Sequence, residues 1–503
     1  MINYVRVPSE IHLSEVKEKE TSWSPSMYRR VIIPTSAVNR VANLLEDYIQ
    51  GTEVGSLAYV RKSTFNFVRT KAIQDYTTLT YPKNDANPFI TPKAYHAALK
   101  TKPARKIIEG DILYTRGGAV GQVAIAYNCG DAIASSHILK LIPKENPFYL
   151  FAFLRHPICR LQQEPSIKGA IRALDNWNKD TLLNCLIPFP NQPAYDRVIK
   201  YVSALMEAIV EKEKAVRDRH VLILRRFTDE LKNTKTSPSF HYECPTVNSI
   251  QESGRMDACF WSPELKKQLW RLFVYRGGIW ESIYKAGYKT RRGPNLAVSV
   301  SGVGYYYDDP YGSAQLHATP GDITDYMTIP RFRYYGNARR VDIVRKGEVM
   351  FAAKGKREVS IGHTYVHLAD ADLVTNFDSF LIDSGNISRN VFLALFLNYC
   401  KQIGIFARLS DTSNGGSFVE GYFSFLPIPK FQDDFQVEMT QLYHHDAPEP
   451  PGQPTLDTFV QWHRRWNFDL GIWELDREMK ALQHTLSEVQ EQIIEGKTVN
   501  VPI

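Results

Sequence analysis

Two histidines, His363 and His367, have a spacing that could serve metal chemistry. On a helix, residues four apart lie on one face, where two imidazole nitrogens can bind one metal ion. The surrounding residues 360–366, Ser-Ile-Gly-His-Thr-Tyr-Val, favour a strand, and in a strand residues four apart are farther from each other. We therefore expect no metal site here, and we expect the adjacent His444 and His445 to be solvated.

Two glycine-containing segments could serve phosphate chemistry. A nucleotide-binding P-loop needs G-x-x-x-x-G-K-[ST], whereas residues 355–357, Gly-Lys-Arg, lack both the first glycine and the hydroxyl. Residues 116–121, Arg-Gly-Gly-Ala-Val-Gly, lie between two apolar, strand-like runs rather than before a helix. Because tight turns require glycine at positive φ, this segment is predicted to be a hairpin turn.

The common catalytic patterns do not appear in the sequence. Methyltransferases that act on exocyclic amines carry Asn/Asp-Pro-Pro-Tyr/Phe, and residues 87–89 and 146–148, both Asn-Pro-Phe, lack the second proline. No paired carboxylates, Ser/His/Asp order or Cys/His arrangement stands out. The six cysteines are scattered without a C-x-x-C spacing, which argues against a zinc ribbon or a disulfide framework. We predict no catalytic residue and no metal ligand in this chain.

Length and composition indicate a folded protein of several domains. The 503 residues exceed what one hydrophobic core usually serves, and 44% hydrophobic with 23% charged residues is typical of globular chains. A net charge of +7 permits a polyanionic partner. Residues 1–20 have charges where a signal peptide needs an apolar run, and no stretch reaches membrane-spanning length. We expect a cytoplasmic protein without a membrane partner.

The sequence contains an internal repeat, the mark of a duplicated module. Each copy combines turn-forming Gly and Pro with short strand-like runs, one apolar helix and a final apolar-proline strand, so an α+β module is predicted. The matched segments keep the same order and are 110–125 with 347–361, 148–154 with 390–397, 169–173 with 415–419, and 186–190 with 425–429.

A long helix is predicted after each copy. Residues 194–237 contain no Gly or Pro, and a helix of about 40 residues extends roughly 60 Å. Its apolar residues keep a heptad-like spacing that Lys212 interrupts. Those of the terminal helix alternate steps of three and four without a break. The two sets are Val198, Val202, Leu205, Ile209 and Val216, and Ile472, Leu475, Met479, Leu482, Leu486, Val489 and Ile493.

Such a seam needs a partner helix. We predict that the two helices pair within the chain as an antiparallel coiled coil, and a coiled coil between two chains is the alternative. Residues 446–454 contain four prolines and no large apolar residue, so an extended linker is predicted before the terminal helix.

Several short motifs occur in a fixed order, partly in both copies. They are Gly-Asp-Ile-Leu at 110–113, Ser-Ser-His-Ile-Leu-Lys-Leu at 135–141, the helix at 147–154, Ile-Pro-Phe-Pro at 187–190, and Arg-Met-Asp-Ala at 255–258 ahead of Ser-Pro-Glu-Leu at 262–265. In these motifs and in its duplicated layout, nearly the whole chain resembles the specificity (S) subunits of type I restriction-modification systems. The second copy departs from the pattern, because Arg357 or Glu358 stands where the first has Gly121.

The resemblance implies two target-recognition domains, each followed by a long helix. It assigns residues 1–191 to the first domain, 192–237 to the first spacer helix, 238–430 to the second domain, and 431–503 to a short helix, the linker and the terminal coiled-coil helix. Each domain would read half of a bipartite, asymmetric site on double-stranded DNA. DNA methyltransferase subunits with S-adenosylmethionine would dock on the helices and methylate adenine, and a restriction and motor subunit would use ATP and Mg²⁺. No catalysis or cofactor would reside in this chain.

The resemblance also implies residues that contact DNA. Phosphates need Lys and Arg, and base edges need side chains that pair in two places. Clusters of such residues alternate with Phe65 and Phe67 in the first copy and with Tyr334 and Tyr335 in the second. The candidates are Arg61, Lys62, Arg69, Lys71, Arg116, Lys168, Arg172 and Asn176, and then Lys289, Arg291, Arg292, Arg331, Arg333, Arg339, Arg340, Lys354, Lys356 and Arg357.

Other functions stay open at this point. The chain could belong to a related phage-defence system that uses the same DNA reader. It could be part of a fused restriction enzyme with a hidden catalytic centre, which would show activity with DNA, Mg²⁺ and S-adenosylmethionine. It could also be a coiled-coil adaptor that does not bind DNA specifically.

Overall fold

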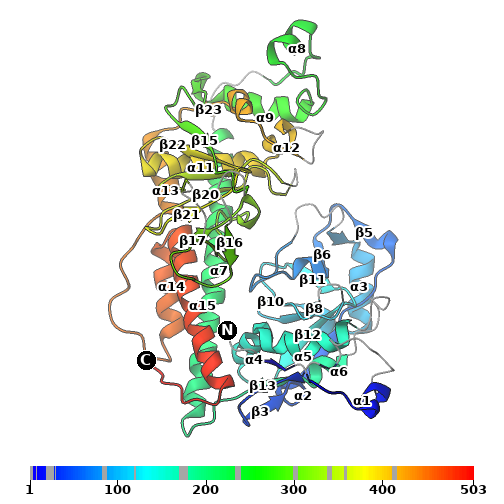
Figure 1. Ribbon diagram of the computed structural model, residues 1–503. Coiled ribbons are helices and arrows are strands. Elements are labelled where there is room, and N and C mark those ends of the chain that lie inside the picture. Colours follow the sequence, from blue (N-terminus) through cyan, green and yellow to red (C-terminus); the bar gives the residue numbers. More distant parts are fainter. Residues whose placement is uncertain are drawn as a thin grey trace. The chain divides into compact units, whose positions relative to one another are not determined.

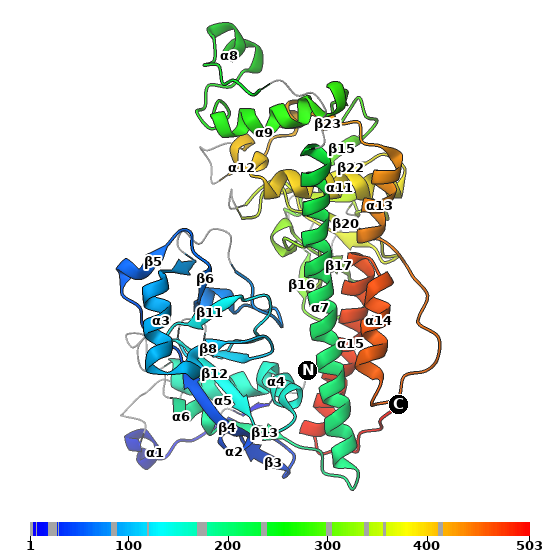
Figure 2. The same ribbon diagram turned by 180° about the vertical axis from the view of Figure 1, so that it is seen from behind.

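The computed structural model describes residues 4–6, 8–18, 28, 30–81, 88–117, 120–168, 179–232, 239–297, 304–336, 342–355, 359–410 and 416–502, without the side chains of 164–168 and 179. The chain forms two compact units of mixed helix and sheet (Figures 1 and 2). Unit 1 comprises Met1–Lys214, Glu449–Phe468 and Glu478–Ile503, and unit 2 comprises Ala215–Pro448 and Asp469–Arg477. The domain boundaries given above stay predictions.

Two sheets organise the first part of unit 1. The antiparallel sheet has the order β10 (Val123–Ile125), β9 (Ile112–Thr115), β12 (Ile138–Pro143), β4 (Leu45–Gln50). The mixed sheet has the order β5 (Tyr59–Val60), β7 (Phe89–Ile90), β6 (Phe65–Val68), β11 (Asp131–Ala134), β8 (Lys106–Ile107), and β6 and β11 run parallel. Two strand pairs are β1 (Val5–Arg6) with β2 (Arg30–Val31) and β3 (Val38–Arg40) with β13 (Leu186–Pro188). The helices are α1 (Leu13–Glu18), α2 (Val41–Leu44), α3 (Pro92–Thr101), α4 (Pro147–Arg155), α5 (Pro157–Lys168) and α6 (Lys179–Leu183).

Unit 2 repeats this plan. Its antiparallel sheet has the order β15 (Lys289–Arg292), β22 (Ser379–Asp383), β19 (Val349–Ala352), β20 (Thr364–Val366). Its mixed sheet has the order β16 (Tyr305–Tyr307), β18 (Arg333–Gly336), β17 (Gln315–His317), β21 (Leu373–Val374), and β14 (Trp280–Glu281) pairs with β23 (Ile428–Pro429). The helices are α8 (Val247–Ser253), α9 (Pro263–Phe273), α11 (Ile387–Gln402), α12 (Ile405–Leu409) and α13 (Asp433–Tyr443).

One turn shows the duplication at the level of single hydrogen bonds. Gly110 and Gly347 both have φ +88°, a conformation that favours glycine. The next residue is an acid in both units, and its carboxylate accepts the backbone N–H three residues earlier, at 2.8 Å for Asp111 and 2.7 Å for Glu348. Strands β9 and β19 follow directly. The repeat predicted from the sequence is therefore present in the topology and in this turn.

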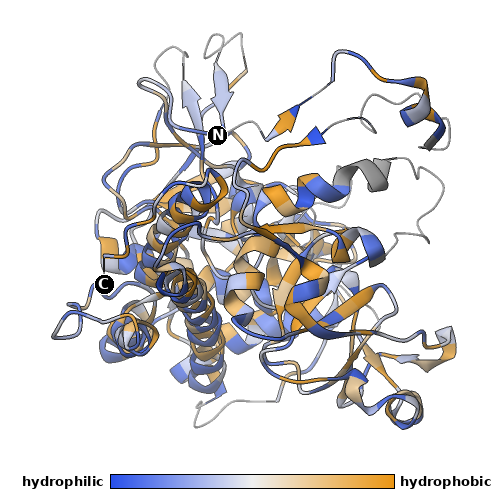
Figure 3. Ribbon diagram, turned by 90° about the horizontal axis from the view of Figure 1, so that it is seen from below, coloured by the Kyte–Doolittle hydropathy of each residue, from blue (hydrophilic) through white to orange (hydrophobic). Residues whose placement is uncertain are grey.

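Helix α7 (Tyr195–Lys232) covers most of the predicted range 194–237, of which residues 233–237 lie outside the described residues. The helices of the structure carry both hydrophobic and hydrophilic residues (Figure 3). Within unit 1, the α7 seam residues Val198, Val202, Leu205 and Ile209 share one apolar core with Leu486, Val489 and Ile493 of α15 (Ile472–Ile494). Burying these faces against each other stabilises helices that would be marginal alone.

A further helix, α14 (Phe459–Asp469), precedes α15. The sequence prediction of a single terminal helix after the linker is therefore wrong. Gly471 lies in the break between the two helices and packs closely against the chain: a Cβ on this residue would meet the Tyr443 carbonyl oxygen at 2.5 Å. The prolines of 446–454 form no helix or strand, as predicted for the linker.

The core of unit 2 centres on an aromatic side chain of α7. Phe227 is fully buried, and its ring lies 5.3 to 6.1 Å from five others. Those rings belong to α11, α13 and the segment before α13, so this residue joins α7 to the apolar helix of the module. The five are Phe392, Phe396, Tyr399, Phe431 and Phe435.

Replacing Phe227 with alanine should lower the free energy of unfolding by about 3 to 5 kcal/mol, because a large buried ring is lost and its neighbours cannot fill the space. Urea titration of the full chain measures the change. Val221→Ala on the same helix is the matched control, since this side chain is 59% exposed, and it should change stability by less than about 0.5 kcal/mol. Equal effects of the two substitutions would contradict this account of the core.

Candidate nucleic-acid interface

Four basic residues lie in the segments that precede and follow strand β6 of the mixed sheet of unit 1. Arg61 and Lys62 are exposed in the turn between β5 and β6, and Lys71 is exposed in the short 3₁₀ helix η3 (Thr70–Ala72). Arg69 is half-buried, with its guanidinium carbon 5.5 Å from the centre of the Tyr59 ring. These four residues, the first basic cluster, present charge that could neutralise phosphates.

The aromatic residues between these cations have a structural role. Phe67 is 2% exposed and packs in a core with Ile90 and Tyr95. Phe65 stacks on the Tyr95 ring at 4.4 Å. Phe65 and Phe67 are two residues apart because alternate residues of strand β6 share one face, and on this face the rings pack inside the protein.

Arg116 and the predicted hairpin lie on the antiparallel sheet. Strands β9 and β10 pair in antiparallel register on both sides of 116–121, so the hairpin is confirmed. Arg116 is half-buried, and its backbone N–H donates to the carbonyl of His137 at 2.8 Å. Lys168 ends α5, and its side chain, with Arg172 and Asn176, lies outside the described residues.

In unit 2, two arginines of β15 are engaged within the fold. Arg291 forms an ion pair with Glu348 at 2.6 Å, and the Glu348 side chain is 4% exposed. Arg292 stacks on the Phe380 ring at 4.0 Å, and burial lowers the pKa of its guanidinium. The neighbouring Lys289 is exposed. Arg291 stabilises the repeated turn as Lys140 does in unit 1, where it pairs with Asp111 at 2.7 Å.

Strands β16 and β18 carry exposed aromatic and basic side chains together. Arg331 and Arg333 are exposed, and the Arg333 guanidinium carbon lies 5.6 Å from the Tyr306 ring. Tyr305 and Tyr306 are 50% and 53% exposed. We call Tyr305, Tyr306, Arg331 and Arg333 the second basic cluster. The sequence reasoning missed the two tyrosines, although the run Tyr-Tyr-Tyr at 305–307 is an available signal for rings at an interface.

The remaining candidates of unit 2 are distributed differently. Lys354 is exposed, with its Nζ 3.8 Å from a carboxylate oxygen of Asp378. Arg339, Arg340, Lys356 and Arg357 lie outside the described residues. The described structure thus brings together two clusters, one in each unit, and leaves DNA contact at each residue a prediction.

The four histidines considered for chemistry have protein partners. The segment around His363 and His367 forms strand β20, as predicted. The Nε2 atoms of His363 and His367 lie 3.0 Å from Asp325 Oδ1 and 2.8 Å from the Ala371 carbonyl oxygen. Within the described ranges, no group of three or more His, Cys, Asp or Glu side chains is arranged to hold a metal ion.

His445 is exposed, as predicted, whereas the prediction that His444 is solvated is wrong, because its side chain is half-buried and paired. His444 Nδ1 pairs with the carboxylate of Glu474, whose side chain is fully buried. The other oxygen of that carboxylate accepts the backbone N–H of His445 at 3.0 Å. A buried carboxylate requires such donors, so these residues fix the start of α15 within unit 2.

The polar interruption of the helix seam is a buried amine. Lys212 is fully buried, its Nζ donates to Asn467 Oδ1 of α14 at 3.0 Å, and it lies 4.9 Å from the Trp466 ring. Arg464, also on α14, forms ion pairs with Glu207 and Glu211 of α7, both at 3.0 Å. Polar pairs inside an apolar seam favour one alignment of the helices over others.

Beside this pair, His463 is 5% exposed. Burial, together with the charge of Lys212, lowers the pKa of His463 to about 3. Since an unfolded histidine has a pKa of about 6.5, the stability that neutral His463 contributes is present above that pH. It is lost as the pH falls toward the folded value.

His463→Phe should therefore make unit 1 less sensitive to acid. From pH 7 to 5, the wild-type chain should lose about 2 kcal/mol more of its free energy of unfolding than the variant. Denaturant titrations at the two pH values measure this difference. His484→Phe on α15 is the control, because His484 has a 75% exposed side chain; a similar change in both variants would contradict the assignment.

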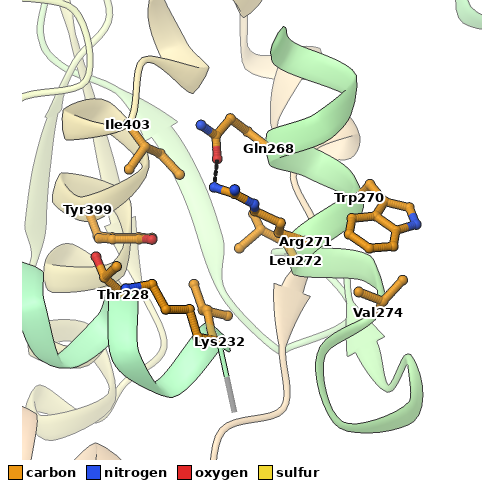
Figure 4. Close-up of a pocket in the computed structure, with 10 residues that line it drawn as sticks. Thr228, Lys232, Gln268, Trp270, Arg271, Leu272, Val274, Tyr399 and Ile403 are labelled. Carbon is orange, nitrogen blue, oxygen red and sulfur yellow. Dashed lines mark hydrogen bonds between the residues drawn. The ribbon is translucent and has the colours of Figure 1, made fainter. Parts of the chain in front are cut away.

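A cavity of about 200 Å³ lies in unit 2 between α7, α9 and α11 (Figure 4). Leu231, Leu272, Tyr399 and Ile403 give it an apolar wall, and Arg271 donates to Gln268 at 3.4 Å at its side. Pockets for drug-sized ligands span roughly 300 to 1,000 Å³. The volume and the lining together are those of a packing gap between helices.

Comparison with known proteins bears on the first module. Residues 56–216 match the family model of the Type I restriction modification DNA specificity domain. The resemblance predicted from the sequence is confirmed over these residues. This specificity domain match covers both sheets of unit 1, except for β4, and the first part of α7. No curated protein gives a significant match to the chain.

Solved structures of specificity subunits also align with the chain. The type I restriction-modification S subunit from M. genitalium has 10% identity and a TM-score of 0.40, with 92% of this chain and 96% of that chain covered. The HsdS subunit from Thermoanaerobacter tengcongensis has 13% identity and a TM-score of 0.25, with 92% and 97% covered. A structure concerned with assembly and conformational transition of the type I R-M system has 13% identity and a TM-score of 0.27, with 92% and 98% covered.

No helix in the described part of the chain combines the length and the apolar character needed to span a membrane.

Proposed function

We propose that this chain is the DNA specificity subunit of a type I restriction-modification complex. The observation that carries the proposal is the duplication: unit 2 repeats the sheets and the acid-stabilised turn of unit 1, and residues 56–216 of unit 1 match a DNA specificity domain. Two related readers in one chain suit a bipartite site, and their different basic clusters suit two different half-sites.

The helices would act as the spacer between the readers. An antiparallel coiled coil of α7 and α15 is supported by their shared apolar core in unit 1. It is also supported at the helix ends: Gln192, just before α7, exchanges two hydrogen bonds with the backbone of Val499, just after α15, at 2.8 and 3.1 Å. The start of one helix therefore lies beside the end of the other.

In this function the chain performs recognition, and chemistry belongs to its partners. Methyltransferase subunits would bind S-adenosylmethionine and methylate adenine, and a restriction and motor subunit would use ATP and Mg²⁺. The chain itself would carry no cofactor and would act in the cytoplasm.

The test is selection from a random duplex pool by the chain in complex with its methyltransferase partner, at fixed moderate salt. Enrichment of two short motifs at a fixed separation is the expected result. An active complex that enriches no motif would overturn the proposal and favour a coiled-coil adaptor. Methylation or cleavage by the chain without partners would favour an enzyme.

Replacing Arg61, Lys62 and Lys71 together with alanine should weaken DNA binding and reduce the slope of log K against log salt by about three. The reason is that three phosphate contacts, and the counterions they release, are lost. Binding measured at several salt concentrations gives the slope. Alanine at three other exposed lysines, Lys267, Lys285 and Lys430, is the control; an equal loss there would mean that net charge, and not the cluster, determines affinity.

A further inference from the structure

Each module contains a turn with a similar short sequence. Residues 73–79 read Ile-Gln-Asp-Tyr-Thr-Thr-Leu and residues 323–329 read Ile-Thr-Asp-Tyr-Met-Thr-Ile. Each directly follows a 3₁₀ helix, η3 in unit 1 and η6 (Pro320–Asp322) in unit 2. We call them the first and second Asp-Tyr turns. Both turns contact α7, each within its own unit.

The first Asp-Tyr turn is bound by one carboxylate of α7. Glu213 Oε2 accepts the backbone N–H and the hydroxyl of Thr77 at 2.7 and 2.8 Å. Its Oε1 accepts the same two groups of Thr78, with the N–H at 3.0 Å. All three residues are at most 6% exposed. The two oxygens thus receive four donors, which is the full capacity of a carboxylate.

The module side of this turn is also fixed. The guanidinium of Arg155, at the end of α4, donates to the carbonyls of Asp75 and Tyr76 and to that of Val123 in β10, at 2.5, 2.8 and 2.8 Å. The turn is therefore attached rigidly to the sheet of the module on one side and to α7 on the other.

The second Asp-Tyr turn meets α7 with different groups. The Tyr326 ring lies 5.3 Å from the guanidinium carbon of Arg217 and meets the ring of His220 edge-on at 5.4 Å. His220 Nε2 lies 2.8 Å from Asn398 Oδ1, and Asn398 donates to the backbone carbonyl of Asp325 at 3.3 Å. The two similar turns thus bind an acidic site on α7 in unit 1 and a basic, aromatic site in unit 2.

We propose that the two Asp-Tyr turns are the positioning elements that fix each recognition module on α7, and that they thereby set the separation of the two half-sites. This inference rests on the proposed function. In unit 1, the apolar core holds α7 through residues 198 to 210. The four hydrogen bonds to Glu213 extend this attachment beyond the apolar core, and they add directional contacts that fix the orientation of the module on the helix.

The test uses Glu213→Gln in the complete complex and compares the DNA sites that it selects with those of the wild type. A neutral amide keeps one acceptor oxygen but replaces the other with an NH2 group that itself donates, so two of the four converging donors lose their acceptor and the attachment of the turn should weaken. The same two motifs should be enriched, but the preference for one separation over its neighbours should fall by about tenfold. Asp229→Asn, an exposed carboxylate of the same helix, should keep the wild-type separation.

Two results would overturn the inference. An unchanged separation would show that the turn does not position the module. The second result is that both Glu213→Gln and the milder Thr77→Val/Thr78→Val variant no longer enrich the first motif at all. That result would mean that the turn is needed for the module to fold, and not for its position. If the wild type enriches no motif, the proposed function fails, and the inference is then judged by a measurement without DNA.

That measurement is the distance distribution between spin labels on the first module and on α7. The labels are attached at Lys100→Cys and Lys200→Cys, two exposed positions that both lie in unit 1. Cys244 and Cys259 are replaced by serine so that they do not take up label. Glu213→Gln should broaden the distribution, and Asp229→Asn should not. Identical narrow distributions in all three proteins would overturn the inference independently of DNA recognition.

Discussion

The structure depends on the burial of α7. A helix of 38 residues gains little from its own hydrogen bonds in water and needs partners along its whole length. Unit 1 supplies α14, α15 and the apolar core around Val198 to Val210, and unit 2 supplies the aromatic cluster around Phe227. Each module is thus built onto the same helix, and its apolar contacts are supplemented by buried polar groups that allow only one arrangement.

Those polar groups explain why apparently similar charges have different roles. Arg291 and Lys140 neutralise the acid of the repeated turn, and Glu213 collects the donors of the first Asp-Tyr turn. A buried charge without partners is costly. In contrast, Arg61, Lys62 and Lys71 are exposed side chains, which a polyanion could contact at the surface.

Local pattern predicted most of the elements but not the contacts between them. The period of three and four predicted α7 and α15, and the repeated Gly-acid turn predicted two related modules. The helix α14 was missed because its apolar positions lie close to the proline-rich linker and end at Gly471. The roles of Arg291 and Lys212 could not be predicted, since Glu348 and Asn467 are distant in sequence. The Asp-Tyr repeat was missed, because its two copies are separated by 250 residues and the other repeated motifs by a different number of residues.

Unit 1 is built from segments that are far apart in the sequence, so it cannot be completed until the end of the chain has been synthesised. Its last pieces, Glu449–Phe468 and Glu478–Ile503, follow the whole of Ala215–Pro448. At about 5 to 20 residues per second, the ribosome needs roughly 10 to 50 s to translate the intervening segment. During that time the face of α7 that α14 and α15 will cover is exposed to water. A nascent or prematurely terminated chain therefore presents an apolar stripe to chaperones and proteases, and only full-length chains can hide it.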